Sequence, residues 1–270
     1  MGKLLRRVSF VIALVVVSWL AYGPLFAWSP ITPGFRTTHT IHAVIRFRDP
    51  PGLRVSPEAI EAALVRLQSD LGLDFESSAR FLLCDEWTDL ARFTPWLRVS
   101  HGVGAITLPI GLATYVTPVV RNRDDLLDFL THEAAHTLLY QHASIRNRLE
   151  MERQAWFVEG VAVHFGNPTA YEPRDEFRRA SPPDVIRAID PTANLNQRGV
   201  GGFRFSYSAD GYFVGYLIEQ FGHDRLIAFT RAYVNDPAAY RVEFQHVFGV
   251  SFDDALRDLV SLPSESNGSH

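Results

Sequence analysis

The string His132-Glu-Ala-Ala-His136 is the feature that most constrains the fold of this 270-residue chain. If the string is helical, His132 and His136 lie one turn apart on one face, so both imidazoles can reach a single metal ion. Leucines at helical spacing before and after the string favour a helix over residues 124–142. Glu133 then lies beside the two histidines, where a water molecule on the ion would be held.

A third metal ligand is expected because catalytic zinc usually takes three protein ligands and leaves one position for water. Glu159 lies in the apolar run Trp-Phe-Val-Glu159-Gly-Val-Ala. A carboxylate in such a run is costly to bury unless it is paired or bound to metal. We therefore expect a second helix, over residues 152–165, to bring Glu159 to the two histidines.

Together these motifs resemble the gluzincin branch of the zincin metallopeptidases, in particular the compact peptidase-MA-like domains of bacteria. The stretch that begins Tyr207-Ser-Ala-Asp-Gly-Tyr212 resembles the tyrosine-bearing helix of that family. The stretch Phe248-Gly-Val-Ser-Phe-Asp-Asp-Ala-Leu resembles its closing helix. The resemblance covers residues 100–262 well and the preceding sheet loosely.

The resemblance implies a role for each matching residue. It implies one Zn²⁺ per chain, held by His132, His136 and Glu159. Glu133 matches the general base, which takes a proton from the zinc-activated water and passes it to the leaving amine. Tyr207 matches the donor to the oxyanion best, and Tyr212 remains an alternative.

The chain also departs from the family pattern. Thermolysin-like relatives carry an acidic residue four positions after the zinc-binding glutamate, where this chain has Val163. Asp128, one turn before His132, is a weak candidate for the missing partner of the histidines. His164 is more often a packed residue than a ligand, so it stays outside the ligand set.

The strand expected over residues 103–108 matches the edge strand of zincins, to which an extended peptide can add. Related aminopeptidases carry there a glutamate that holds the free amine of the substrate. This chain has Thr107 and Leu108 in that neighbourhood and no carboxylate. The departure favours an endopeptidase over an exopeptidase.

The N-terminus carries a candidate membrane segment. Lys3, Arg6 and Arg7 precede an uncharged stretch, residues 8–28, that is long enough to cross a bilayer. Positive charge before the stretch predicts a single-pass protein of the inner (cytoplasmic) membrane, with residues 1–7 in the cytoplasm and the catalytic domain on the periplasmic side. The alternative is a signal peptide, cleaved before Pro24 or Trp28, that leaves a secreted or periplasmic protein.

The charge balance and the cysteine content argue against several classes of protein. The 26 Lys and Arg nearly balance the 30 Asp and Glu, so no basic excess indicates a nucleic-acid partner. The single cysteine, Cys84, excludes an internal disulfide and a cysteine-rich zinc finger, and its apolar surroundings favour a buried side chain. The oligomeric state does not follow from the sequence.

These patterns predict an α+β, zincin-like fold in which a small N-terminal mixed sheet and the active-site helix precede a mainly helical half. We expect a linker over residues 29–35, one metallopeptidase domain over 36–262 and a flexible tail over 263–270. A half-buried strand is expected from Thr40, because apolar residues alternate with polar ones: Ile41, Ala43, Ile45 and Phe47 share one face, and His42, Val44, Arg46 and Arg48 share the other. A second strand is expected over 79–84. Further helices are expected from Pro57 to a stop at Gly72, and over 209–221, 225–234, 238–247 and 251–261. A long connection rich in Pro, Arg and Gly is expected between residues 166 and 205, with only a brief helical hint near 183–189.

The function expected from these features is zinc-dependent hydrolysis of peptide or protein substrates by an exported, membrane-anchored endopeptidase. The alternative is a zinc-binding but non-proteolytic factor for assembly or quality control, which binds polypeptide through the same groove. A metal-free structural module is a third class, and it requires both metal motifs to be coincidental.

Overall fold

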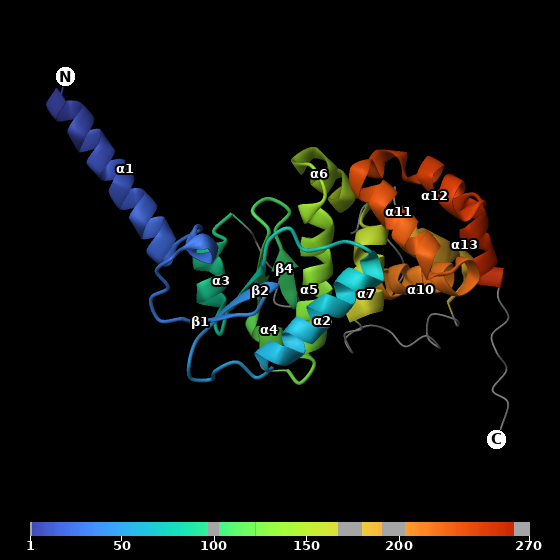
Figure 1. Ribbon diagram of the computed structural model, residues 1–270, viewed down its shortest axis with the longest axis horizontal. Helices are drawn as coiled ribbons and strands as arrows, with labels where there is room; N and C mark the ends of the chain where they lie inside the picture. The colour runs from blue at the N-terminus through green and yellow to red at the C-terminus, as the bar shows by residue number, and fades with distance from the viewer. Residues whose placement is uncertain (1, 97–102, 122, 167–179, 191–202, 262–270) are drawn as a thin grey trace. The chain divides into compact units, whose positions relative to one another are not determined.

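The computed structural model describes residues 2–96, 103–121, 123–166, 180–190 and 203–261. The fold is α+β, with a small mixed sheet as the sequence predicts (Figure 1). The chain divides into two compact units, one of residues 1–61 and 78–127, the other of 62–77 and 128–270. The first unit includes the N-terminal residues, and the metallopeptidase domain expected over residues 36–262 stays a prediction. The tail expected over 263–270 lies outside the described residues.

The N-terminal unit is built on a five-stranded sheet with the strand order β1-β2-β3-β5-β4. The pairs β1/β2 and β4/β5 are antiparallel, and β2/β3 and β3/β5 are parallel. The strand expected over 103–108 is a shorter edge strand, while β1 and β5 have no counterpart in the prediction. The strands are β1 (Arg36–His39), β2 (Ala43–Phe47), β3 (Ala79–Leu83), β4 (Ala105–Thr107) and β5 (Ala113–Val116).

Strand β2 shows where the alternating pattern is right and where it fails. Ile45 and Phe47 are buried as expected, but Ile41 precedes the strand and is 79% exposed. Arg46, expected on the polar face, is buried. It is buried because its guanidinium group donates hydrogen bonds to the carbonyl oxygens of Ala27 and Ser29, the latter at 2.8 Å.

The apolar N-terminal stretch is not one continuous helix. Helix α1 (Gly2–Tyr22) ends before the 3-10 helix η1 (Phe26–Trp28). Phe26, Ala27 and Phe35 are buried in a core cluster of the N-terminal unit. Phe35, the last residue of the linker expected over residues 29–35, therefore belongs to this core. The unit also contains two helices that were not predicted, α3 (Trp87–Phe93) and α4 (Pro118–Arg121).

Helix α2 (Pro57–Leu71) follows its sequence signals closely. The Ser56 hydroxyl accepts a hydrogen bond from the amide of Ala59 at 3.1 Å, which satisfies one free N–H of the first turn. Gly72 ends the helix with a φ of +63°, a left-handed conformation that glycine adopts at little cost.

The second unit is helical, and it contains the expected helix around His132. The segment expected as one helix over 152–165 is instead two helices, which meet at Ala155 (φ 46°). Most of the long connection expected between residues 166 and 205 lies outside the described residues. The helices are α5 (Leu126–Gln141), α6 (Ile145–Gln154), α7 (Trp156–Gly166), α9 (Pro182–Ile189), α10 (Phe203–Phe221), α11 (His223–Asn235), α12 (Tyr240–Phe248) and α13 (Phe252–Ser261).

An aromatic cluster fixes the start of α7 in this unit. Trp156, which is fully buried, lies 4.9 Å from Phe252 and 5.5 Å from Phe213, measured between ring centroids. Aromatic pairs at these separations attract each other in addition to the apolar surface that they bury. The cluster thereby holds α7 against α10 and α13, and it sets the position of Glu159 one turn further along α7.

Candidate metal centre

Helix α5 supplies the two histidines of the centre. Both side chains are almost fully buried, and the Nε2 atoms of His132 and His136 lie 3.3 Å apart. The i, i+4 spacing therefore brings both imidazoles to one point on the helix face, as the sequence predicts.

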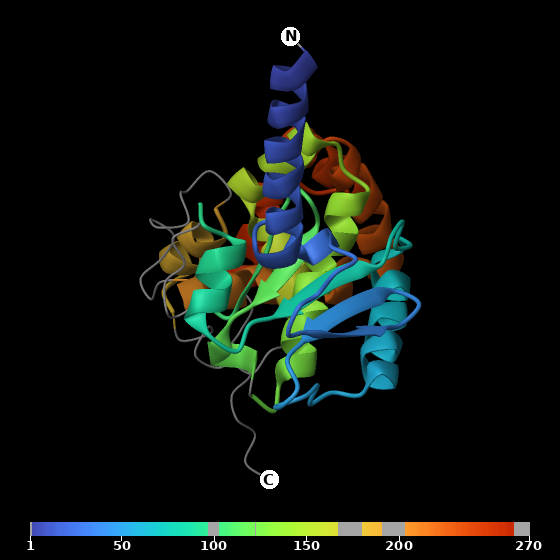
Figure 2. The same ribbon diagram turned by 90° about the vertical axis from the view of Figure 1, so that its left-hand side faces the viewer.

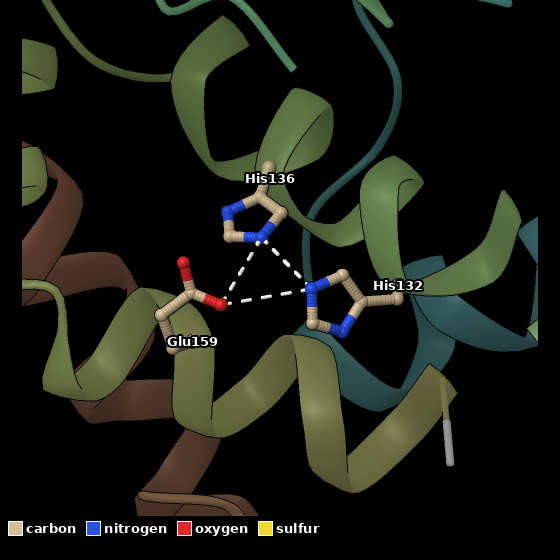
Figure 3. Close-up of side chains that lie close together, drawn as sticks. All are labelled: His132, His136 and Glu159. Atoms are coloured by element: carbon tan, nitrogen blue, oxygen red, sulfur yellow. Dashed lines mark hydrogen bonds and ion pairs between the residues drawn. The ribbon is translucent and has the colours of Figure 1, made fainter. Parts of the chain in front are cut away.

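Helix α7 brings the third candidate ligand to the same point. The Oε2 atom of Glu159 lies 3.6 Å from Nε2 of His132 and 3.7 Å from Nε2 of His136. Figure 3 shows the three side chains pointing toward one another. Over the part of the chain that the structure describes, these residues form a group whose three candidate ligand atoms lie within 4.8 Å of one another.

Close packing between α5 and α7 holds this geometry. A Cβ atom at Gly166 would lie 2.8 Å from the backbone of His132, so glycine allows the end of α7 to touch α5. Trp156 fixes the other end of α7 in the aromatic cluster. Glu159 lies between these two fixed points, and its carboxylate therefore has a defined position.

The charges of the centre depend on one another. Burial alone would lower the pKa of His132, but the neighbouring carboxylates of Glu159 and Glu133 outweigh it and raise that pKa. Burial alone would raise the pKa of Glu159, but the two imidazoles and the hydroxyl of Tyr207 hold that pKa below its usual range. The site thus stabilises an ionised carboxylate in a largely water-excluded position, where positive charge is favoured.

Glu133 and Tyr207 lie at the same centre. Glu133 is buried beside His132, whose pKa it helps to raise. The Tyr207 hydroxyl donates a hydrogen bond to the Glu159 carboxylate. Tyr207 therefore reaches the three-residue group from α10, which begins at Phe203, six residues before the start of the helix expected over 209–221.

Tyr212 lies on a different side of α10. Asp210, Gly211 and Val214 face α7, because a Cβ at Gly160 would touch Asp210 and Val214, and one at Gly211 would touch Val163. At about 100° per residue these positions share a face with Tyr207, whereas Tyr212 is roughly 140° away from Tyr207. The helix thus separates the two candidate tyrosines.

Two residues near the centre were not singled out by the sequence analysis. The Tyr140 ring lies 6.1 Å from the His136 ring, and its hydroxyl donates a hydrogen bond to the carboxylate of Glu152 on α6. Burial raises the pKa of Glu152, and the hydrogen bond from Tyr140 acts against that shift. The sequence signal for Tyr140 was its i+4 spacing from His136, which places it on the ligand face of α5.

The remaining candidates have other surroundings. Val163, at the position where thermolysin-like proteins carry an acidic residue, is a buried apolar residue here. The backbone of Ala162 next to it contributes to the raised pKa of His132. The ring of His164 lies over Gly215 of α10 rather than in the group. Asp128 lies on α5 one turn before His132, and its role as a partner of the histidines stays a prediction.

The residues of the group fit a divalent metal. Two imidazoles and one carboxylate form a donor set typical of catalytic zinc sites, which leave one position open. The Oε2 atom of Glu159 is buried and accepts no hydrogen bond from the described residues. A buried carboxylate oxygen in that state is costly, and a cation between the three ligand atoms would compensate it.

Comparison with known proteins adds no relative: no protein-family model matches the chain, and no curated protein matches its sequence.

Proposed function

We propose that the protein is a zinc-dependent peptidase with a zincin-like fold that cleaves within polypeptides. The observation that carries the proposal is the convergence of His132, His136 and Glu159 on one buried point. The order of the motifs along the chain supports it, because Glu133 lies between the two histidines and a tyrosine-bearing helix follows.

The chemistry depends on the metal and on two side chains. When bound, Zn²⁺ would act as a Lewis acid on the scissile carbonyl and would lower the pKa of a water molecule toward about 7. Glu133 is not one of the three converging ligands, so its carboxylate is available to take the proton of the attacking water and return it to the leaving amine. Tyr207 would donate a hydrogen bond to the carbonyl oxygen as negative charge develops on it.

We further propose that α1 anchors the protein in the cytoplasmic membrane. Within this helix, the 19 residues Leu4–Tyr22 have the length and composition that suffice to cross a bilayer. Lys3, Arg6 and Arg7 at its beginning favour a cytoplasmic N-terminus, with both units on the other side.

The test is a cleavage assay on casein and on a peptide library, with zinc content measured on the same samples. Wild-type protein is expected to carry about one zinc per chain and to cleave internal bonds. Glu133→Gln is expected to keep zinc and to lose cleavage by several orders of magnitude, because base and proton shuttle are both removed. Zinc without cleavage in the wild type would favour a polypeptide-binding factor, and protein without zinc would overturn the proposal.

A further inference from the structure

The end of α1 is joined to the rest of the N-terminal unit by a short connection. Three residues separate Tyr22, the last of the helix, from Phe26. The amides of Gly23 and Leu25 donate hydrogen bonds to the carbonyl of Trp19, at 3.0 and 3.2 Å, and the amide of Phe26 donates to Gly23. The connection is therefore a hydrogen-bonded turn rather than a flexible tether.

The residues that follow the turn are fixed in the core of the unit. Phe26 is 1% exposed, and its ring stacks on Phe93 of α3 with centroids 4.6 Å apart. The buried side chain of Arg46 holds the carbonyls of Ala27 and Ser29. Figures 1 and 2 show α1 projecting from the N-terminal unit, with α3 beside its end in Figure 1. If α1 spans a bilayer, the unit must lie directly at the membrane face.

Three large apolar side chains near the end of α1 are exposed. Ile31, Trp96 and Ile110 are each more than half exposed, at 57%, 57% and 60%. Ile31 follows Ser29 by two residues, and its amide donates to the Ser29 hydroxyl. Trp96 comes shortly after Phe93, and Ile110 precedes Gly111, which packs against the Trp28 ring. Scattered exposed apolar residues are common, but Ile31 belongs to the segment that follows α1, and Trp96 and Ile110 are close in sequence to Phe93 and Gly111, which lie against Phe26 and Trp28 of that segment.

Aromatic and cationic groups at the end of α1 have the character of a membrane interface. Trp19 and Tyr22, in the last turn, are 50% and 54% exposed. The guanidinium group of Arg92 lies 5.9 Å from the centre of the Tyr22 ring. Tryptophan and tyrosine gather at the headgroup level of membranes because their rings are apolar at one end and polar at the other.

We infer that the helix-exit surface, defined as Trp19, Tyr22, Ile31, Trp96 and Ile110, rests in the headgroup region of the bilayer that α1 spans. The N-terminal unit then contacts the membrane through its own side chains, in addition to its attachment through α1. The inference rests on the proposed membrane anchor. Its occupant is the lipid interface, because the surface is continuous with the last turn of the apolar helix.

The test uses the full-length chain in nanodiscs of phosphatidylethanolamine and phosphatidylglycerol. Ile31→Cys and Trp96→Cys carry an environment-sensitive fluorophore, and Ile41→Cys is the matched control. Ile41 is 79% exposed and precedes strand β2, five residues before Arg46, whose side chain contacts the segment that follows α1. The native Cys84 is fully buried with its pKa raised by that burial, so the label reacts with the introduced cysteine.

Quenching of the label's fluorescence shows whether each position lies in the headgroup region or in water. Lipids with a spin-labelled headgroup are expected to quench positions 31 and 96 roughly threefold more strongly than position 41, since an interfacial contact buries side chains by only about 5–10 Å. Aqueous iodide is expected to quench position 41 most. Equal iodide quenching at all three positions overturns the inference, as does protection of 31 and 96 from both quenchers, which indicates a protein partner or a second copy. Protein that never enters the nanodisc contradicts the anchor itself.

Discussion

Gly160 of α7 lies directly against the backbone of Asp210 in α10, so close that a Cβ atom at Gly160 would be 2.8 Å from the Asp210 carbonyl oxygen. Gly160 follows the candidate ligand Glu159, and Asp210 lies one turn after Tyr207. The contact therefore determines how near the tyrosine helix comes to the carboxylate. A glycine is required here for helix approach, although its φ is ordinary.

Gly160→Ala should destabilise the protein and weaken its metal binding. The added methyl group meets a backbone oxygen that cannot move without shifting α10, and overpacking of this kind costs about 1–3 kcal/mol. Thermal unfolding and zinc content measure the two effects. Gly215→Ala is the control, because its methyl group would meet the His164 side chain at 3.2 Å, and a side chain can rotate away. Equal stability of the two variants would contradict this account of the helix contact.

Tyr207→Phe should lower kcat by about 100- to 1000-fold, with little change in KM and an unchanged zinc content. The phenol that contacts Glu159 is lost, and with it the proposed donor to the developing negative charge. Tyr212→Phe, roughly 140° away around α10, is the matched control and should behave like the wild type. A large loss in Tyr212→Phe alone would transfer the role to that residue. Near-normal activity in both variants would leave the oxyanion without a tyrosine donor.

His136→Ala should abolish stoichiometric zinc, because two remaining ligands rarely hold the metal. His142→Ala is the control on the same stretch of chain. The His142 ring donates a hydrogen bond to the Asp74 carbonyl at 2.7 Å and lies outside the candidate ligand group. Native mass spectrometry before and after treatment with a chelator measures the metal in both variants. A full equivalent of zinc in His136→Ala would refute the ligand assignment.

The sequence predicts the relative position of the two histidines better than it predicts the sheet, because His132 and His136 follow a local helical period. His132 and His136 are one turn apart on α5, and the partly buried position of Glu159 agrees with its apolar neighbours. Strand β1 carries no alternating apolar pattern, and it forms by pairing with β2. Helix α6 is mostly polar, and its clearest local signal is Ser144, whose side chain caps the amide of Asn147.

Arg46 and Phe26 illustrate what a sequence pattern cannot give. An alternating strand assigns Arg46 to the polar face, but its guanidinium group finds carbonyl partners in a segment earlier in the chain. Phe26 belongs to the apolar stretch that is expected to cross a membrane, yet it is a core residue of the N-terminal unit. The burial of both residues depends on contacts with residues distant in the sequence, and local propensity does not predict such contacts.

Glu61 should make stability depend on pH in the acidic range. Burial alone would raise the pKa of Glu61, but hydrogen bonds from Thr40 and His42 outweigh it and lower that pKa. A lowered folded-state pKa gives stability that is present above the unfolded-state pKa and is lost as the pH falls through the folded value. Glu61→Gln should cost about 1 kcal/mol at pH 7 and progressively less below roughly pH 4.

Thermal unfolding of Glu61→Gln from pH 3 to pH 7 measures this difference. Glu58→Gln, an exposed position in the first turn of the same helix, is the control and should show a small effect throughout. If the loss of stability in Glu61→Gln, relative to the wild type, stays constant with pH, that result would contradict the role of the ionised carboxylate.

Phe26→Ala should destabilise the N-terminal unit strongly, whereas Ile31→Ala should not. Phe26 is 1% exposed between Phe93 and Phe35, so truncation leaves a cavity that costs about 3–5 kcal/mol, while Ile31 is 57% exposed. The midpoint of thermal unfolding of the full chain in detergent compares the two variants.

The packing of Phe26 also predicts whether the N-terminal segment is cleaved, because cleavage before Trp28 would remove both Phe26 and Ala27 from the core. The intact mass of protein purified from membranes should therefore include residues 1–27, and a stable mature form that begins at Trp28 would show that the core does not need them.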